Sequence, residues 1–140
     1  VLPMYEWMPL YAGAGGEGIL AFLPEEEIDE ILSKTDLKPL TDQTLTDVAE
    51  LKRELADIRR HGYAMTVGRL IAGAAGVSAP VFGPDDRVIG VIVLALPDVR
   101  FGDRNPDELG AEVAACADAI SADLGARGNV RLAARDSSPR

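Results

Sequence analysis

The sequence has little of what enzymes and nucleic-acid-binding domains usually need. It contains one histidine, His61, and one cysteine, Cys116, so it offers neither a partnered nucleophile nor a metal-ligand set at fixed spacing. Basic residues number 14 against 23 acidic ones, and the formal net charge of -9 repels phosphate. We therefore expect no catalysis, no bound metal or cofactor, and no direct contact with DNA.

The sequence also lacks the features of membrane and secreted proteins. No stretch reaches the roughly 18 apolar residues of a membrane span. One cysteine cannot form an internal disulfide. We expect a cytoplasmic protein without membrane contact. Residues 1–4 have neither an initiator Met nor the pattern of a signal peptide, so we expect the chain to be part of a longer protein.

What the sequence does contain predicts an α+β domain. Helical periods lie in four segments, over residues 12–22, from Pro24 as a first helical residue, from an N-cap at Thr46 to a stop at Gly62, and over 105–124. Strand patterns cover residues 63–67, 74–82 and 87–96, with a hairpin turn at 83–86.

Two of these elements carry finer expectations. Residues 88–94 are apolar on both faces, which predicts a central strand covered on both sides. The last helix has one apolar stripe, which comprises Leu109, Val113, Cys116, Ile120 and Leu124. This position predicts that Cys116 is a small core residue. Residues 127–140 have little to bury and are expected to be a disordered tail.

A glycine-rich segment at residues 13–18, G-A-G-G-E-G, satisfies the dinucleotide pattern G-x-G-x-x-G. A dinucleotide site needs an apolar strand before the glycines and a second strand after them. Here prolines interrupt the preceding segment and an acidic helix from Pro24 follows, so a nucleotide cofactor is disfavoured. The free N–H groups of this turn are still suited to a carboxylate or another anion.

A second cluster lies close to the start of the chain, where Met4, Tyr5, Trp7 and Met8 crowd together. Such a group forms either the wall of a ligand site or a hydrophobic contact with a preceding segment. The sequence leaves both interpretations open.

Three ordered stretches resemble the effector-binding domain of IclR-family transcriptional regulators. Residues 9–24, P-L-Y-A-G-A-G-G-E-G-I-L-A-F-L-P, follow the family pattern P-L-H-A-T-A-x-G-K-A-L-L-A-F-L-P. Residues 59–64, R-R-H-G-Y-A, and 77–82, V-S-A-P-V-F, are similar to R-x-x-G-Y-A and I-A-A-P-V-F. The closing helix ending in Leu124-Gly125 completes the set.

The resemblance implies a non-enzymatic, GAF-like domain over residues 1–126, with a curved antiparallel sheet and helices on its faces. It also implies that the first strands of the domain and the winged helix-turn-helix lie outside this chain. DNA would then be bound only through that other domain. Homodimers or dimers of dimers, and a small-molecule effector that shifts their arrangement, are the implied partners.

Departures from the family pattern bear on the ligand. Polar positions of family members that sense keto or hydroxy acids fall on Thr66, Gly76, Val93 and Ala95, and only Thr66 keeps a polar group. Glu17 replaces the Lys of the first motif, and Gly68 with Arg69 replaces a pair of acids. The resemblance therefore implies a less polar ligand than those members bind.

Strand alternation suggests an apolar cavity between two strands. The expected ligand is a small apolar or aromatic acid, with its carboxylate at the N–H groups of Ala14 and Gly15 and its body against Met65, Val93 and Ala95. The remaining candidate lining residues are Thr66, Ala74, Gly76, Ser78 and Val91. The alternative is a structural dimerisation module whose own side chains fill this space.

Overall fold

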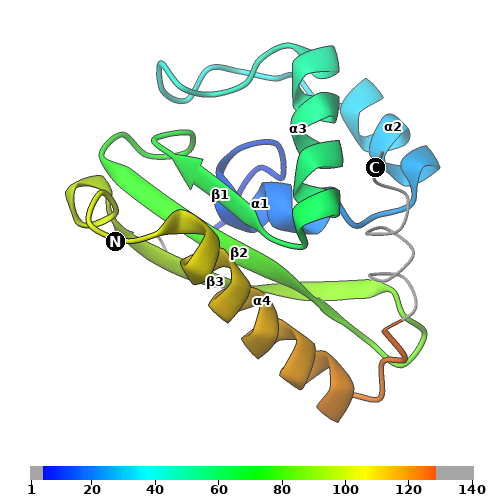
Figure 1. Cartoon of the computed structure of the whole chain (residues 1–140). Coiled ribbons are helices and arrows are strands. Elements are labelled where there is room, and N and C mark those ends of the chain that lie inside the picture. The colour runs from blue at the N-terminus through cyan, green and yellow to red at the C-terminus, as the bar shows by residue number, and fades with distance from the viewer. Residues whose placement is uncertain (1–4, 129–140) are drawn as a thin grey trace.

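Helices and a three-stranded antiparallel sheet make up residues 5–128, the part of the chain that the computed structural model describes (Figure 1). The strands lie in the order β1-β2-β3. The elements are α1 (Gly13–Leu20), α2 (Glu25–Ser33), α3 (Val48–His61), β1 (Ala64–Val67), β2 (Ala74–Phe82), β3 (Val88–Pro97), a 3-10 turn η1 (Asp98–Arg100) and α4 (Pro106–Asp123). This content confirms the predicted α+β class.

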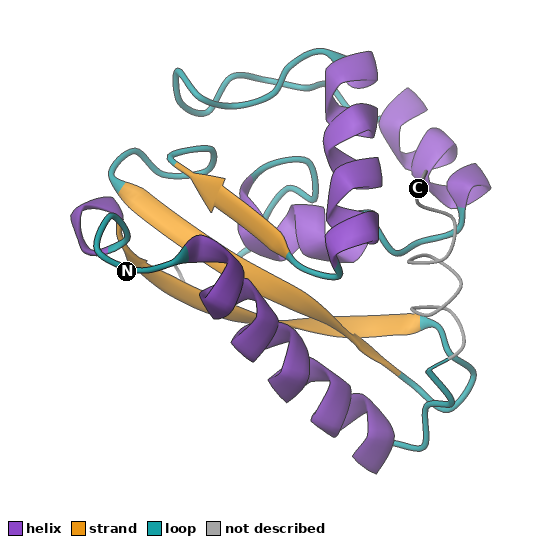
Figure 2. Ribbon diagram, viewed as in Figure 1, coloured by secondary structure: helices purple, strands orange, loops and turns teal. Residues whose placement is uncertain are grey.

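The helices cover the two faces of the sheet in separate layers (Figure 2). Helix α4 packs on one face, where it forms a core with alternate residues of β2. Helix α1 packs on the opposite face, and α2 and α3 join it in a second core. Strand β2 is central and almost completely buried, so it contributes side chains to both layers.

The register of the sheet decides which side chains face each helix. Gly76 pairs with Ala95 and Thr66, and Ser78 pairs with Val93 and Ala64. Because side chains alternate along a strand, these positions share the α1 face. Val77, Ala79 and Val81 point to the α4 face, where Met65 and Ile92 pack beside them.

Capping residues fix the ends of the long helices. The side chain of Asp47 accepts a hydrogen bond from the Glu50 N–H, and Gly62 ends α3 in the left-handed region with φ 86°. Asn105 caps α4 in the same way, with Pro106 in the first turn. The predicted N-cap at Thr46 is therefore wrong by one residue, and Pro24 is the N-cap of α2 instead of its first helical residue.

Two further expectations were wrong. β3 is an edge strand and not a central one, because among residues 5–128 only β2 pairs with it. Its apolar faces are accordingly half-exposed, as at Val93 and Leu94. Cys116 is exposed, because the buried side of α4 runs through Ala114 and Ala117, one position away from the predicted stripe.

The two ends of the chain add little regular structure to the described part. Residues 5–10 form no strand or helix, and most of the tail predicted at 127–140 lies outside residues 5–128. Within the described part, no helix is long and apolar enough to cross a membrane.

Candidate ligand-binding cavity

Helix α1 approaches the sheet closely enough to require small residues at the contact. A Cβ atom added to Gly18 would lie 2.2 Å from the Ser78 hydroxyl oxygen, and one added to Gly76 would lie 2.9 Å from Cβ of Ala14. The Ser78 hydroxyl donates a hydrogen bond of 2.5 Å to the Ala14 carbonyl oxygen. Within the glycine-rich motif, helix-to-sheet packing thus explains Gly18, whereas Gly16 is required by the backbone of Leu10, which a Cβ atom would approach to 2.6 Å.

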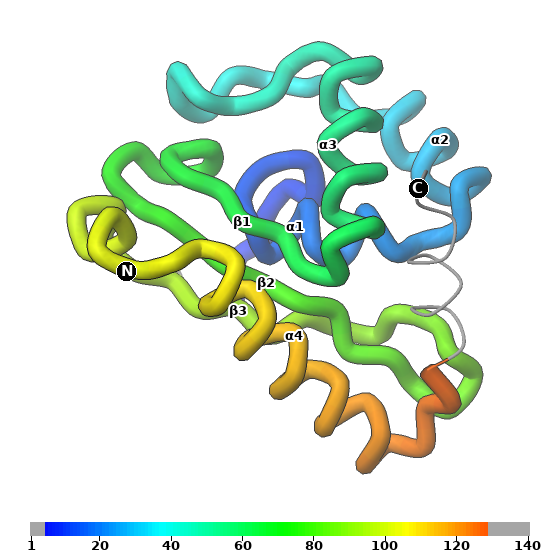
Figure 3. Tube along the Cα trace, viewed as in Figure 1, coloured from blue at the N-terminus to red at the C-terminus, as the bar shows by residue number. Residues whose placement is uncertain are grey.

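A cavity of about 350 Å³ opens beside the first turn of α1. Its walls come from the start of α1, the α1 face of the sheet, the segment before α1 and the loop after β1. Figure 3 shows the backbone course of these segments. Thr66 and Arg69 are the only polar side chains among the described lining residues. The walls are therefore mainly apolar, which suits an apolar body better than a highly polar one.

The structure brings most of the predicted site residues together. The predicted residues that line the cavity are Ala14, Gly15, Thr66, Ala74, Gly76, Val93 and Ala95. Ser78 and Val91 lie on the α1 face of the sheet, as predicted, but they do not line the cavity. They lie beneath α1, where a Cβ atom on Gly18 would touch both. Met65 does not line the cavity, because it packs with the α4 core on the opposite face.

Sequence reasoning missed the walls that come from loops. Leu70 and Ile71 follow β1, and Pro9 and Leu10 precede α1. Strand periodicity carries no information about these irregular segments. Met8 also lines the cavity, whereas Trp7 is fully exposed, so the cluster at the start of the chain is divided between a wall and solvent.

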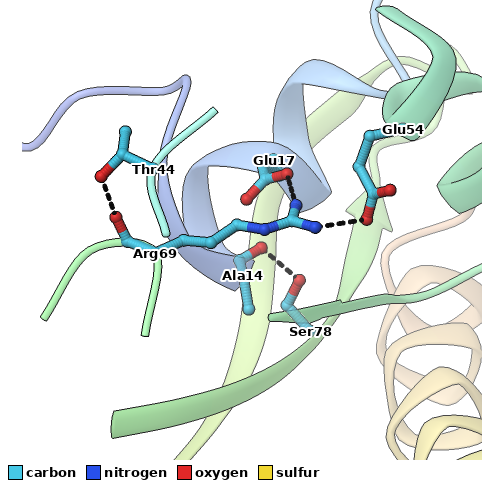
Figure 4. Close-up of polar contacts among 6 residues, drawn as sticks. All are labelled: Ala14, Glu17, Thr44, Glu54, Arg69 and Ser78. Atoms are coloured by element: carbon cyan, nitrogen blue, oxygen red, sulfur yellow. Dashed lines mark hydrogen bonds and ion pairs between the residues drawn. The ribbon is translucent and has the colours of Figure 1, made fainter. Parts of the chain in front are cut away.

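An ion-pair cluster connects three elements (Figure 4), and one of its members, Arg69, lines the cavity. Arg69, in the loop after β1, places Nη1 2.5 Å from Oε1 of Glu17 on α1 and Nη2 3.2 Å from Oε1 of Glu54 on α3. The Thr44 hydroxyl donates to the Arg69 carbonyl oxygen at 2.7 Å and so fixes the loop. The cluster thus ties α1 to a residue of the cavity wall, Arg69.

Glu17 is unusual because its side chain is completely buried. Burial raises the pKa of its carboxyl group to about 7, although the Arg69 guanidinium opposes this rise. Glu54 adds to the increase, whereas a hydrogen bond from Arg69 and the backbone N–H of Gly13 lower the pKa. Its second oxygen, Oε2, has no hydrogen-bond partner among residues 5–128. Glu17 therefore titrates near neutral pH.

Comparison with known proteins identifies the fold and the family. The model of the bacterial transcriptional regulator IclR C-terminal domain matches residues 4–122. The chain belongs to the IclR family. The regulator KdgR of Dickeya chrysanthemi is 32% identical over 117 residues, which cover 84% of this chain and 38% of KdgR. Such relatives are transcriptional regulators and not enzymes, in agreement with the prediction.

Solved structures of IclR-family domains have the same GAF-like architecture. The Thermotoga maritima IclR structure has a TM-score of 0.80 and 32% identity, and covers 89% of this chain and 52% of that one. A double mutant of the PobR inducer-binding domain from Acinetobacter, in complex with 3-hydroxybenzoic acid, has a TM-score of 0.71 at 22% identity, over 89% of this chain and 72% of that one. The latter likeness shows the fold alone.

The chain spans less than half the length of KdgR and about half of the Thermotoga IclR chain. Within this IclR-family domain, two departures from the family pattern are complementary. Position 17 carries an acid where the pattern has Lys, and position 69 carries Arg where the pattern has an acid. In the folded chain, the side chains at these two positions form one ion pair.

Proposed function

We propose that this domain binds a small apolar or aromatic carboxylic acid in the cavity beside α1 and thereby alters DNA binding by the N-terminal part of the full-length regulator. The observation that carries this proposal is an open, mainly apolar cavity with one helix start in its wall. Its volume of about 350 Å³ lies at the lower end of the range for small-molecule sites.

The start of α1 supplies the group that would bind the carboxylate. The N-cap residue of this helix, Ala12, makes no capping hydrogen bond with its side chain, and helix geometry leaves the N–H groups of the first turn without a partner inside the helix. Ala14 and Gly15 line the cavity in this first turn. Unpaired N–H groups and the positive end of the helix dipole both favour an anion there.

The body of the acid would lie against the small side chains of the sheet. Gly76, Val93 and Ala95 face the cavity and present no hydrogen-bonding side chain. A ligand with several hydroxyl or keto groups would lose its water contacts at these walls without gaining partners. The lack of hydrogen-bonding partners at these walls supports an apolar or aromatic acid over a compact polar one.

The second candidate is a dimerisation module without a ligand. It requires that the domain's own side chains fill the space beside α1, whereas this space is open. Homodimers or dimers of dimers remain part of the leading proposal, since effectors in such assemblies act by shifting the preferred arrangement of subunits.

A thermal-shift panel tests the proposal. The chain is heated with benzoate, phenylacetate, hexanoate and pyruvate, and with benzyl alcohol and hexanol, which lack the carboxylate. We expect the larger acids to raise Tm, pyruvate to do so less, and the alcohols to have the smallest effect. If none of the acids raises Tm, the domain is not a sensor of this ligand class and the structural-module alternative is favoured.

A further inference from the structure

Glu17 follows the proposed carboxylate site at Ala14 and Gly15 along α1, but its side chain is on the buried side of the helix. The backbone N–H of Gly13 acts on the Glu17 carboxylate, and Gly13 and Gly16 line the cavity. Glu17 itself is completely buried and does not reach the cavity surface. A ligand carboxylate at Ala14 and Gly15 would therefore share the positive end of α1 with Glu17.

The charges around Glu17 can be counted from the structure. The groups that act on it are Arg69, from the loop after β1, and Glu54, from α3. The strands beneath α1 carry no ionisable side chain. The cluster of Glu17, Glu54 and Arg69 thus has a net charge of minus one when Glu17 is ionised and zero when it is protonated.

The hydrogen bonding of Glu17 favours the neutral form as well. Oε1 contacts Arg69 (Figure 4), while Oε2 is buried and has no hydrogen-bond partner in the described part of the chain. A buried oxygen that lacks a donor costs most when it carries charge. The other terminal nitrogen of Arg69 is paired with Glu54, so the guanidinium is shared between two carboxylates.

We propose that Glu17 selects the charge state of the complex: a carboxylic acid enters the cavity as an anion, and Glu17 takes up a proton from solvent when the acid binds. The inference rests on the proposed function. Two carboxylates at one helix start repel each other, so occupancy of the site favours protonation of Glu17. The net charge of the site is conserved, because the ligand adds one negative charge and the proton removes one.

Isothermal titration calorimetry measures this proton directly. The full 140-residue chain is titrated with benzoate and with hexanoate at pH 6, 7 and 8, each in two buffers of different ionisation enthalpy. Both acids stay ionised over this range, so any proton taken up from the buffer goes to the protein and not to the ligand. We expect almost no uptake at pH 6, about half a proton at pH 7, close to one at pH 8, and an affinity roughly fivefold lower at pH 8 than at pH 7.

Two variants assign the proton to its site. Glu17→Gln keeps the shape of the side chain but cannot titrate, so proton uptake should vanish and affinity should become nearly independent of pH. Glu54→Gln removes a charge that raises the pKa of Glu17. It should move the same proton uptake to lower pH while Glu17 and its Arg69 partner remain.

The outcomes separate the two proposals. Absence of binding heat with both acids would overturn the proposed function and this inference with it. Binding without proton uptake at pH 8, or uptake that persists in Glu17→Gln, would overturn only the role of Glu17, because the acids would still bind. If circular dichroism shows that Glu17→Gln does not fold, the direction of the shift in Glu54→Gln decides alone.

Discussion

The two faces of the sheet differ, although β2 contributes side chains to both. On the α4 face, Val77, Ala79 and Val81 are buried in a continuous apolar core. On the α1 face, Gly76 and Ser78 bring a helix very close, and an open cavity remains beside its first turn. One face is built for packing density and the other leaves space, so changes on them should affect stability and ligand binding separately.

The largest effect is expected on the packed face. Ala79 is completely buried beneath α4, and Ala79→Asp would place a charge there without a partner. We expect the free energy of unfolding to fall by about 4 kcal/mol or more, as measured by urea denaturation. The exposed Ala111→Asp on α4 is the matched control and should cost less than about 1 kcal/mol. Similar losses in both would mean that the α4 face is not a sealed core.

The next effect belongs to the cavity side and depends on pH. The folded state raises the pKa of Glu17 from 4.5 to about 7, so the folded chain binds this proton more tightly than the unfolded chain. The stability that this proton supplies is complete below pH 4.5 and is lost as the pH rises through 7. Relative to Glu17→Gln, the wild type should lose about 2–3 kcal/mol between pH 5 and pH 8.5. Parallel stability curves for the two proteins would contradict the burial of an ionisable Glu17.

Filling the cavity should change binding more than stability. Ala95 lies at the exposed end of the cavity wall, where Ala95→Leu adds volume without entering a packed core. We expect the thermal shift with benzoate to disappear, while the free energy of unfolding changes by less than about 1 kcal/mol. Ala119→Leu, on the exposed side of α4, should leave the shift intact. A benzoate response that survives in Ala95→Leu would place the ligand elsewhere.

The smallest effect distinguishes neighbouring residues of one strand. Val93 faces the cavity and Leu94 faces the α4 side, and their exposed fractions are nearly equal at 42% and 41%. Val93→Ser should shift the preference of the domain toward more polar acids such as pyruvate, because it adds a hydroxyl group to the wall. Leu94→Ser should lower Tm by a few degrees at most and leave ligand preference unchanged. Equal changes in ligand preference in the two variants would show that preference does not depend on the side chains of the α1 face.

Much of the fold was predictable from local patterns. The bounds of β2, the stop of α3 at Gly62 and the hairpin after Phe82 follow from strand patterns and from the positions of glycine and proline. Alternation also placed Gly76, Val93 and Ala95 on one face. The same rule excludes Met65 as a partner of Thr66, since adjacent strand residues point to opposite faces.

The remaining features depend on tertiary contacts that periodicity does not encode. The exposure of Cys116 depends on how far α4 turns over the sheet, and the edge position of β3 depends on which strands are available to pair. The substitutions at positions 17 and 69 were visible in the sequence as two separate departures. Only the folded chain shows that they are one ion pair.

The edge position of β3 has a practical consequence for handling the protein. Its outer side offers backbone hydrogen-bonding groups flanked by Ile89 and Val93, with no Lys or Arg inside the strand to discourage pairing. Strand edges of this kind recruit other strands and promote aggregation. We therefore expect solubility, rather than thermal stability, to limit the concentration at which this chain can be crystallised or studied by NMR.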